Sequence, residues 1–286
     1  MPIAAAVVAI ALFSIMDALM KRAAIAGGVF SAMLVRSVLA GLVIALIWRA
    51  RGGRWPTSAI LRLHALRGVV CAGMATTFFY GLVRTPMAQG MALSFMAPLI
   101  ALYLAAVMLG ERVRKAAIIA SLMGLAGVSL IAAERITGAP MQGEAIRGIA
   151  AIFLSAVLYA WNLVLQRKQA QLASPSEVAV FQNLFVALSL LPLAPWLWIM
   201  PQAGAWSDLA LAAVLATASL MLLAWAYARA EAQVLLPIEY TAFVWAALMG
   251  WLWFAEGLTA GTLAGAALIV TGCLIGTRGP KAATAP

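Results

Sequence analysis

Long apolar stretches, separated by short polar or Pro/Gly segments, dominate the sequence. Each is about 20 residues long, the length that a helix needs to cross the hydrocarbon core of a bilayer. Ten of them can be recognised, near residues 3–20, 30–48, 67–84, 88–109, 116–133, 148–165, 178–198, 208–228, 234–255 and 260–277. Hydrophobic residues make up 65% of the chain and charged residues 10%, against about half and a quarter in a soluble domain. The sequence therefore predicts an all-α polytopic membrane protein with ten transmembrane helices, and it excludes a soluble enzyme.

Residues that could support metal or nucleophilic chemistry are scarce. Cys71 and Cys273 are the only cysteines in the sequence, and the only histidine, His64, falls in a segment that we expect to be a basic loop. Two thiols inside apolar stretches make neither a disulfide framework nor a metal site. Asp17 and Glu239 are expected near opposite membrane faces, so they do not form a catalytic carboxylate pair. We therefore expect no metal, no cofactor and no enzymatic activity.

The basic residues are distributed unevenly between the two sides of the predicted bundle. The net charge is +10, and most arginines and lysines, Arg62 and Arg67 among them, fall in loops on the side of the two chain ends. The positive-inside rule then places both termini in the cytoplasm. This accounts for the charge without nucleic acid and favours a bacterial inner membrane. The first apolar stretch lacks a preceding basic region, so we interpret it as a retained helix rather than a signal peptide.

The sequence repeats itself at a spacing of 145 residues. The matched positions are Asp17 with Asn162, Arg22 with Arg167, the segment 79–84 with 224–229, Glu111 with Glu256, and Gly127 with Gly272. Each half holds five predicted helices, and an odd number inverts the second half in the membrane. The prediction is therefore two inverted five-helix repeats, residues 1–145 and 146–286, with a binding site near the midplane where they meet.

Each half also ends in a characteristic motif. The two versions are Leu109-Gly110-Glu111-Arg112 followed by a glycine-rich helix at 124–128, and Ala255-Glu256-Gly257-Leu258-Thr259 followed by another at 265–272. These motifs resemble the helix 4–helix 5 pattern of the EamA repeat in the drug/metabolite transporter superfamily. Within it the chain looks most similar to the YddG-type aromatic amino acid exporters, which implies a central cavity and export of Phe, Tyr and Trp. Gly257 departs from the pattern, because it stands where the first repeat has Arg112.

Small residues and prolines recur at defined positions of the predicted helices. Gly257, Gly261 and Gly265 are spaced by four residues, and such stripes let helices approach closely. They indicate either tight packing of the last helix of each half or a homodimer interface, so both a monomer and a homodimer remain open. Pro98 and Pro237 lie inside predicted spans, where each can produce a kink. Pro237 is a candidate gating residue.

Charged residues inside membrane spans are rare and informative. Asp17 and Arg36 are expected at similar depth, either as a structural ion pair or with Asp17 binding a substrate amine or a proton. Glu239 either pairs with Arg229 or takes part in coupling or gating. No lysine or arginine is expected at the midplane. The sequence therefore disfavours a phosphorylated substrate and favours a neutral, zwitterionic or lipophilic cationic one.

Deep aromatic residues suggest the substrate class. Buried tyrosine and tryptophan need polar partners, so some of them are expected to face a wet cavity, although aromatic packing between helices is the alternative for each. The candidate substrate-binding residues are Tyr80, Tyr103, Trp161, Asn162, Trp225 and Tyr240. Such a cavity suits aromatic amino acids or similar small amphipathic metabolites, exported by alternating access as helices 3–4 and 8–9 rock. The alternative is the same fold exporting threonine- or homoserine-type amino acids or cationic drugs.

Overall fold

The computed structural model describes residues 1–85, 87–94, 96–110, 115–136, 143–255 and 260–277. These parts of the chain are helical and contain no strand. Seven of their helices are long and apolar enough to cross a membrane, and shorter apolar helices accompany them. The predicted all-α polytopic membrane fold is confirmed. The motif residues Glu111, Arg112, Glu256 and Gly257 lie outside the described residues.

The helices follow the ten apolar stretches, and three stretches, 88–109, 178–198 and 234–255, are divided. The first half contains α1 (Pro2–Gly27), α2 (Val29–Ala50), α3 (Ser58–Arg84), α4 (Met87–Ser94), α5 (Met96–Leu109) and α6 (Lys115–Ile136). The second half contains α7 (Gly143–Leu172), α8 (Pro175–Leu190), the short turn η1 (Leu191–Leu193), α9 (Ala194–Leu197), α10 (Ala205–Arg229), α11 (Ala232–Glu239), α12 (Thr241–Phe254) and α13 (Ala260–Thr277). Thus α4 with α5, and α11 with α12, each occupy one predicted span.

Local sequence determines several helix ends. Gly28 separates α1 from α2 with a φ of 83°, a backbone conformation that glycine adopts without steric cost. At the start of α8 the Ser174 hydroxyl accepts a hydrogen bond from the Glu177 amide at 3.3 Å, and Pro175 occupies the first turn. Both are favoured residues at a helix N-terminus, because the first amides of a helix have no partner within it.

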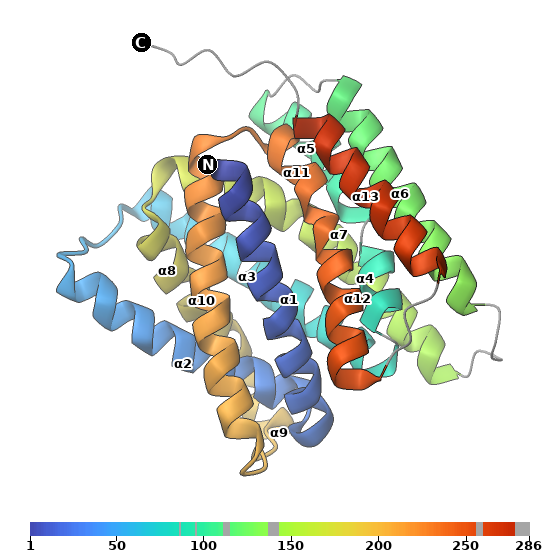
Figure 1. The fold of residues 1–286 in the computed structure, drawn as a ribbon. Coiled ribbons are helices and arrows are strands. Elements are labelled where there is room, and N and C mark those ends of the chain that lie inside the picture. The colour runs from blue at the N-terminus through green and yellow to red at the C-terminus, as the bar shows by residue number, and fades with distance from the viewer. Residues whose placement is uncertain (86, 95, 111–114, 137–142, 256–259, 278–286) are drawn as a thin grey trace.

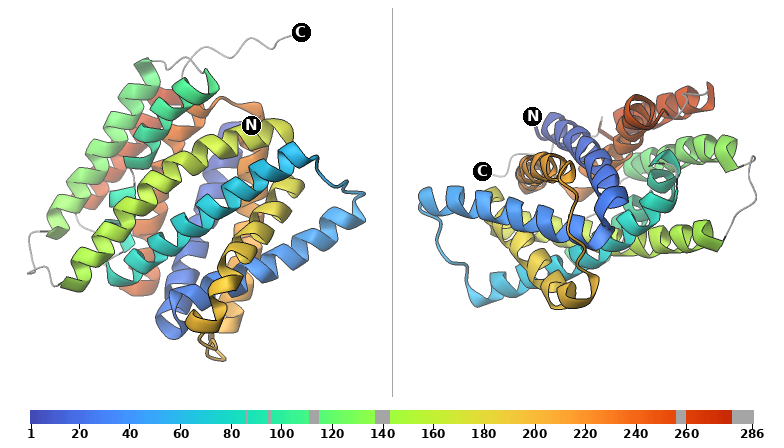
Figure 2. Two further views of the ribbon diagram at one scale, coloured as in Figure 1. Left: turned by 180° about the vertical axis from the view of Figure 1, so that it is seen from behind. Right: turned by 90° about the horizontal axis from the view of Figure 1, so that it is seen from below.

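The two halves are related by the predicted repeat and are interleaved. The bounds of α11 and α12 equal those of α4 and α5 at an offset of 145 residues. The most extensive packing occurs across the halves: α1 packs on α10, and its repeat-related counterpart α7 packs on α3. The pair α2–α8 lies at one side of the bundle and the pair α6–α13 at the other (Figures 1 and 2). The surfaces where the halves meet therefore run through the middle of the bundle.

The ninth predicted span is interrupted close to its proline. Pro237 lies inside α11, which ends at Glu239, and α12 begins at Thr241. Proline has no amide hydrogen to donate within a helix. Beside the turn at Tyr240, the Thr241 hydroxyl donates to the Ile238 carbonyl at 2.7 Å. Glu239 is thus the last residue of α11, directly before the break.

Glycines bring the last helices of the two halves together. A Cβ atom on Gly127 of α6 would lie 2.6 Å from the Gly265 carbonyl oxygen of α13, and one on Gly272 would lie 3.0 Å from the Ala120 carbonyl. Backbones approach this closely only where side chains are absent. Gly127, Gly265 and Gly272 thus serve helix packing inside the chain.

Candidate functional site

A cavity of about 190 Å³ lies between the two halves, near the middle of the bundle. Its wall combines apolar side chains, among them Phe13, Met74, Phe78 and Phe79, with many polar ones. The polar and ionisable residues of the wall are Ser14, Asp17, Arg36, Arg67, Cys71, Ser94, Ser155, Tyr159, Asn162, Gln166, Gln182, Asn183 and Glu239. The site therefore presents both signs of charge beside aromatic surface.

Arg67 of α3 is the centre of a polar network that joins the two halves. Its side chain is 1% exposed, and its guanidinium donates through Nε to Asn162 Oδ1 at 3.0 Å and through a second nitrogen to Gln166 Oε1 at 2.6 Å. The third nitrogen donates to Gln169 Oε1. Asn162, Gln166 and Gln169 share one face of α7, because positions separated by three or four residues align on a helix. Three neutral amides thus fix Arg67 without neutralising its charge.

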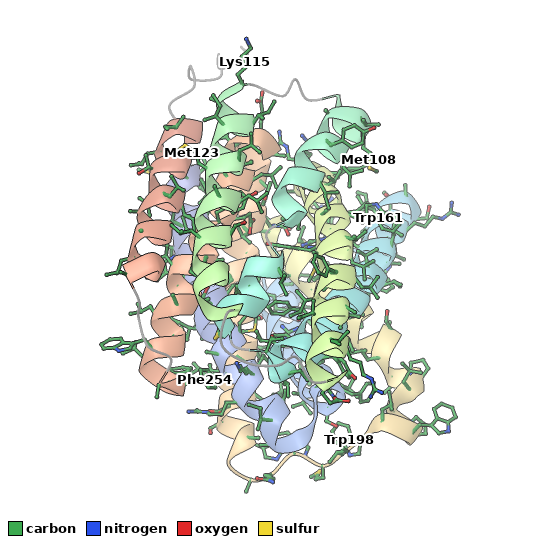
Figure 3. The ribbon with its side chains drawn as sticks, turned by 90° about the vertical axis from the view of Figure 1, so that its right-hand side faces the viewer. Met108, Lys115, Met123, Trp161, Trp198 and Phe254 are labelled. Atoms are coloured by element: carbon green, nitrogen blue, oxygen red, sulfur yellow. The ribbon has the colours of Figure 1, made fainter. Side chains whose placement is uncertain are left out.

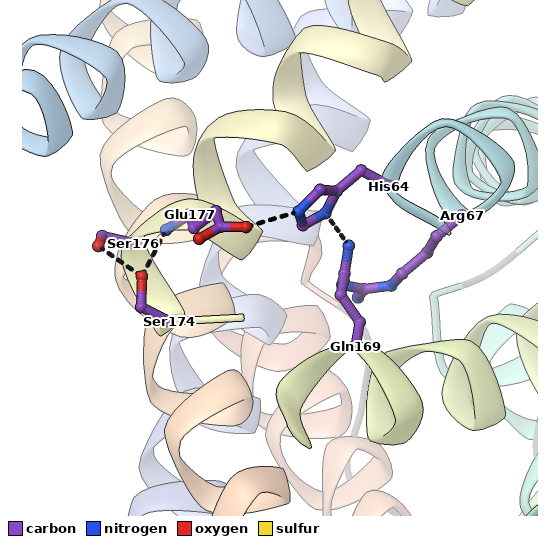
Figure 4. A network of polar contacts seen from close by, with 6 residues as sticks. All are labelled: His64, Arg67, Gln169, Ser174, Ser176 and Glu177. Carbon is purple, nitrogen blue, oxygen red and sulfur yellow. Dashed lines mark hydrogen bonds and ion pairs between the residues drawn. The ribbon is translucent and has the colours of Figure 1, made fainter. Parts of the chain in front are cut away.

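The network continues from Arg67 toward the end of the bundle that holds the N-terminus (Figure 4). Gln169 Nε2 contacts His64 Nδ1, and His64 Nε2 lies 3.2 Å from Glu177 Oε1. The His64 ring also stacks on Phe181, with 4.9 Å between centroids. If the imidazole proton is on Nε2, the hydrogen bonds run in one direction: Arg67 donates to Gln169, Gln169 to His64, and His64 to Glu177. The chain of bonds links α3, α7 and α8.

The predicted loop positions of His64 and Arg67 are wrong. Both lie inside α3, which begins at Ser58 rather than near residue 67, and both side chains are buried. They are one helical turn apart and face the amides of α7, while Arg62 is exposed. Their polar partners make burial tolerable, because a buried cation needs hydrogen-bond acceptors. The expectation that no arginine reaches the cavity is also wrong, since Arg36 and Arg67 line it.

Glu239 is held by two tyrosine hydroxyls. Tyr159 of α7 donates to Oε2 at 2.6 Å, and Tyr227 of α10 donates to Oε1 at 3.2 Å. The predicted pairing of Glu239 with Arg229 does not form. Arg229 instead donates to the Trp225 carbonyl at 3.2 Å and lies over the Trp225 ring. The Glu239 carboxyl is therefore bound by neutral donors at the cavity wall.

Asp17 of α1 and Arg36 of α2 both line the cavity. Within the described parts of the chain, no hydrogen bond or ion pair joins their side chains, so the predicted Asp17–Arg36 ion pair is not formed. Arg36 Nε is buried and has no hydrogen-bond partner among the described residues. The two opposite charges interact through space without a direct contact. A carboxylate and a guanidinium on the wall of one cavity can each bind a ligand group of opposite charge.

Tyr80 and Trp225 occupy equivalent positions in the two repeats and make equivalent contacts. The Arg84 guanidinium lies 3.6 Å from the Tyr80 ring centroid, and Arg229 lies 4.3 Å from that of Trp225. Each arginine also donates to the carbonyl four residues earlier, at 3.0 and 3.2 Å. Arg84 further donates to Glu144 at 2.8 Å, which lowers the pKa of that exposed carboxyl. The two aromatic rings stabilise the ends of α3 and α10 and do not contribute to the described cavity wall.

The other predicted binding residues are dispersed. Asn162 lines the cavity and binds Arg67. Trp161 is 37% exposed and lies on the outer side of α7 (Figure 3), and Tyr103 is 69% exposed on α5. Tyr240 is buried at the α11–α12 turn, in contact with Gly124 of α6. Consecutive helical residues diverge by about 100°, so Trp161 and Asn162 cannot face the same side.

Two neighbouring cations secure the opposite end of the bundle. Lys21 donates to the Thr85 carbonyl at 3.2 Å and lies 4.9 Å from the Phe254 ring centroid. Arg22 binds the Asp208 carboxylate through both oxygens, one of them at 2.6 Å from Nε. These contacts tie the end of α1 to α10, α12 and the segment after α3. Polar contacts between different helices therefore lie on both sides of the cavity.

An all-helical membrane bundle of two interleaved repeats around a central charged cavity has the architecture of a secondary transporter. The model of the EamA-like transporter family matches residues 1–133 and again 146–278. The chain belongs to the EamA-like transporter family. It is therefore a multi-pass membrane transporter and not an enzyme.

Individual relatives agree with this assignment and differ in what they transport. The chain is 28% identical over 280 residues to the pseudopaline exporter of Pseudomonas aeruginosa, covering 96% of this chain and 95% of the relative. It is 25% identical over 215 residues to an S-adenosylmethionine uptake transporter of Rickettsia felis, covering 74% and 70% of the two chains. A solved crystal structure matches with a TM-score of 0.77 at 24% identity, over 96% of this chain and 95% of that one. This last likeness concerns the fold.

Proposed function

We propose that this transporter exports a small zwitterionic metabolite of the amino acid type, with an apolar or aromatic side group. The observation that carries the proposal is the composition of the cavity wall, where Asp17 and Arg36, which make no direct ion pair, line the same cavity as Phe13, Phe78 and Phe79. A carboxylate and an ammonium group need one cation and one anion, and an aromatic side group needs apolar surface. Phenylalanine, tyrosine and tryptophan meet these requirements.

The charges of the wall weigh against the alternatives. Arg36 and Arg67 repel a cationic drug, and Asp17 and Glu239 repel a phosphate ester. Threonine and homoserine have the same ammonium and carboxylate groups, but their side chains have no apolar group large enough to contact the phenylalanines of the wall. The functions of the two relatives, pseudopaline export and S-adenosylmethionine uptake, support small-metabolite transport, and the direction of transport is a matter for experiment.

For the mechanism we propose alternating access, with α4–α5 and α11–α12 moving around the cavity. The break after Pro237 supplies a pivot beside Glu239. Glu239 and Asp17 are proposed to carry the coupling proton, because each carboxyl lines the cavity and belongs to the interface between the halves. Tyr159 and Tyr227 keep Glu239 in place through the cycle.

The placement in the cell is also a proposal. We propose a bacterial inner membrane, cytoplasmic N- and C-termini, repeats bounded at residues 145 and 146, and a monomer or homodimer. Reporter fusions at each end test the topology. A fluorescent protein at the C-terminus should fold and fluoresce, and a C-terminal alkaline phosphatase should stay inactive. The reverse pattern contradicts the proposed orientation.

Counterflow in proteoliposomes tests the substrate. Vesicles loaded with unlabelled phenylalanine, at equal pH on both sides, should take up labelled tryptophan faster than vesicles without protein. Threonine-loaded vesicles with labelled threonine serve as the matched comparison. Tryptophan counterflow without threonine counterflow supports the aromatic proposal. Threonine counterflow with silent tryptophan retains amino acid transport and rejects the aromatic side group.

A further inference from the structure

Three buried polar atoms at the cavity wall have no hydrogen-bond partner among the described residues. They are Arg36 Nε, Gln166 Nε2 and Gln182 Oε1. The three residues are 9%, 3% and 5% exposed. Buried polar groups in folded proteins are nearly always bonded, because an unbonded one loses its interaction with water without replacement. Two vacant donors and one vacant acceptor on residues that line the same cavity therefore point to a polar ligand.

The two arginines of the cavity differ in their freedom to bind that ligand. Every nitrogen of the Arg67 side chain already donates to an amide oxygen of α7. One of those acceptors is Gln166 Oε1, so Arg67 fixes the Gln166 amide and leaves its Nε2 available. Arg36 has no such acceptors among the described residues. Arg67 has the contacts of a positioning residue, and Arg36 has those of a binding residue.

The two vacant donors and the vacant acceptor match the two charged groups at one end of the proposed substrate. A carboxylate accepts hydrogen bonds from a guanidinium and an amide, and charge-assisted bonds of this kind are the stronger ones. The ammonium group next to it can donate to Gln182 Oε1, with Asp17 supplying the opposite charge at the same wall. Cys71 lies close to Arg36, Arg67 and Gln182, which places these groups in one region of the cavity.

We propose that Arg36, together with Gln166 and Gln182, binds the α-carboxylate and its neighbouring ammonium group, while Arg67 acts only by positioning Gln166. The proposal rests on the proposed function, and it assigns the substrate's charged end to α2, α7 and α8. The aromatic side group then extends toward Phe78 and Phe79 of α3. Recognition of the common amino acid moiety is thereby separated from recognition of the side chain.

The test compares amino acids with their amides, which keep the ammonium and the side chain but lack the carboxylate charge. Wild-type protein, Arg36→Gln and the exposed control Arg62→Gln are reconstituted in liposomes. Concentration dependence is measured for phenylalanine, tryptophan and methionine and for their amides. Wild type and the control should prefer each acid over its amide by about tenfold or more. Arg36→Gln should reduce this preference to below about threefold while amide transport persists, which also shows that the variant is folded.

Chemical labelling gives a second measurement that does not depend on transport. In a Cys273→Ser background, phenylalanine should slow the reaction of Cys71 with N-ethylmaleimide, and phenylalaninamide should protect less. In Arg36→Lys, which keeps a charge but loses the planar fork, protection by phenylalanine should require a concentration at least several-fold higher.

The outcomes separate the two proposals. Transport of the acids by the wild type, together with an unchanged acid-to-amide preference and unchanged Cys71 protection in the Arg36 variants, overturns the assignment of Arg36 and leaves the proposed function intact. Absence of transport and of protection for all three amino acids in the wild type overturns both.

Discussion

The Tyr159 hydroxyl on α7 lies 2.6 Å from Oε2 of Glu239 on α11, and this bond joins a long helix to the broken one. Tyr227 of α10 holds the other carboxyl oxygen. A carboxyl bound only by neutral hydroxyls can gain or lose a proton without breaking an ion pair. This geometry makes Glu239 the residue on which a test of proton coupling should begin.

Replacing Glu239 with glutamine should separate exchange from accumulation. The amide keeps the shape of the side chain and a partner for each tyrosine but cannot ionise. We expect accumulation driven by a pH gradient to fall by about tenfold or more, since coupling requires a proton site. Counterflow at equal pH should stay within about twofold of wild type. Glu144→Gln, at the exposed start of α7, is the control, and full gradient-driven accumulation by Glu239→Gln contradicts a coupling role.

Removing the Arg67 guanidinium should destabilise the protein. Arg67→Met leaves the acceptor oxygens of Asn162, Gln166 and Gln169 without their donor, at a cost of about 3 kcal/mol or more. Thermal unfolding in detergent should show a clearly lower Tm, with less monodisperse protein after size exclusion. Arg62→Met, five residues earlier and exposed, should leave Tm unchanged. Equal Tm values for the two variants contradict the structural role of the network.

Adding one methyl group between α6 and α13 should have a measurable cost. The new Cβ in Gly127→Ala meets the Gly265 carbonyl at 2.6 Å, so the helices must separate, at a cost of about 1–3 kcal/mol. Gly204→Ala meets no atom within 4 Å and is the matched control. Urea or heat unfolding of purified protein should separate the two variants. Size exclusion of the same two variants tests dimerisation: loss of an oligomer without loss of Tm in Gly127→Ala would assign Gly127 to an interface between chains.

The two aromatic residues Trp161 and Phe78 should differ in their effect on substrate affinity. Trp161 is on the outer side of α7, and Phe78 is on the cavity wall. Phe78→Ala removes apolar contact and should raise the KM for phenylalanine by about tenfold. Trp161→Ala should leave KM within about twofold. The opposite ranking places the aromatic side group outside the described cavity.

The number, order and repetition of the helices can be predicted from the sequence, because they depend on patterns that extend over many residues. Spans of about 20 apolar residues and a constant offset between halves identify the helices and their repetition. The bounds of α11 and α12 follow those of α4 and α5 at that offset. The resemblance to the EamA repeat led to the family that the comparison shows.

The interior of the site was less accessible, because it depends on which side of each helix faces inward. Charge favours a loop for Arg67 and His64, and their burial requires partners on a helix distant in the sequence. One signal is present in the sequence: Asn162, Gln166 and Gln169 are spaced by four and three residues, so that their amides share one face of a helix. Amides at this spacing predict a buried polar side chain on a neighbouring helix. The deep aromatic residues carry no such signal.

The cross-packing of the two halves has a consequence for biosynthesis. Asp17, Arg36 and Arg67 belong to the half that leaves the ribosome first, and the amides that bind Arg67 are on α7. Until α7 is inserted, α3 carries a guanidinium into lipid without its acceptors, and α1 lacks its main packing partner α10. We therefore expect α1 and α3 to be held in the translocon, to be bound by other proteins, or to lie near the membrane surface until α7 and α10 are inserted. Synthesis of residues 143–172 supplies the acceptors that the Arg67 guanidinium lacks until then.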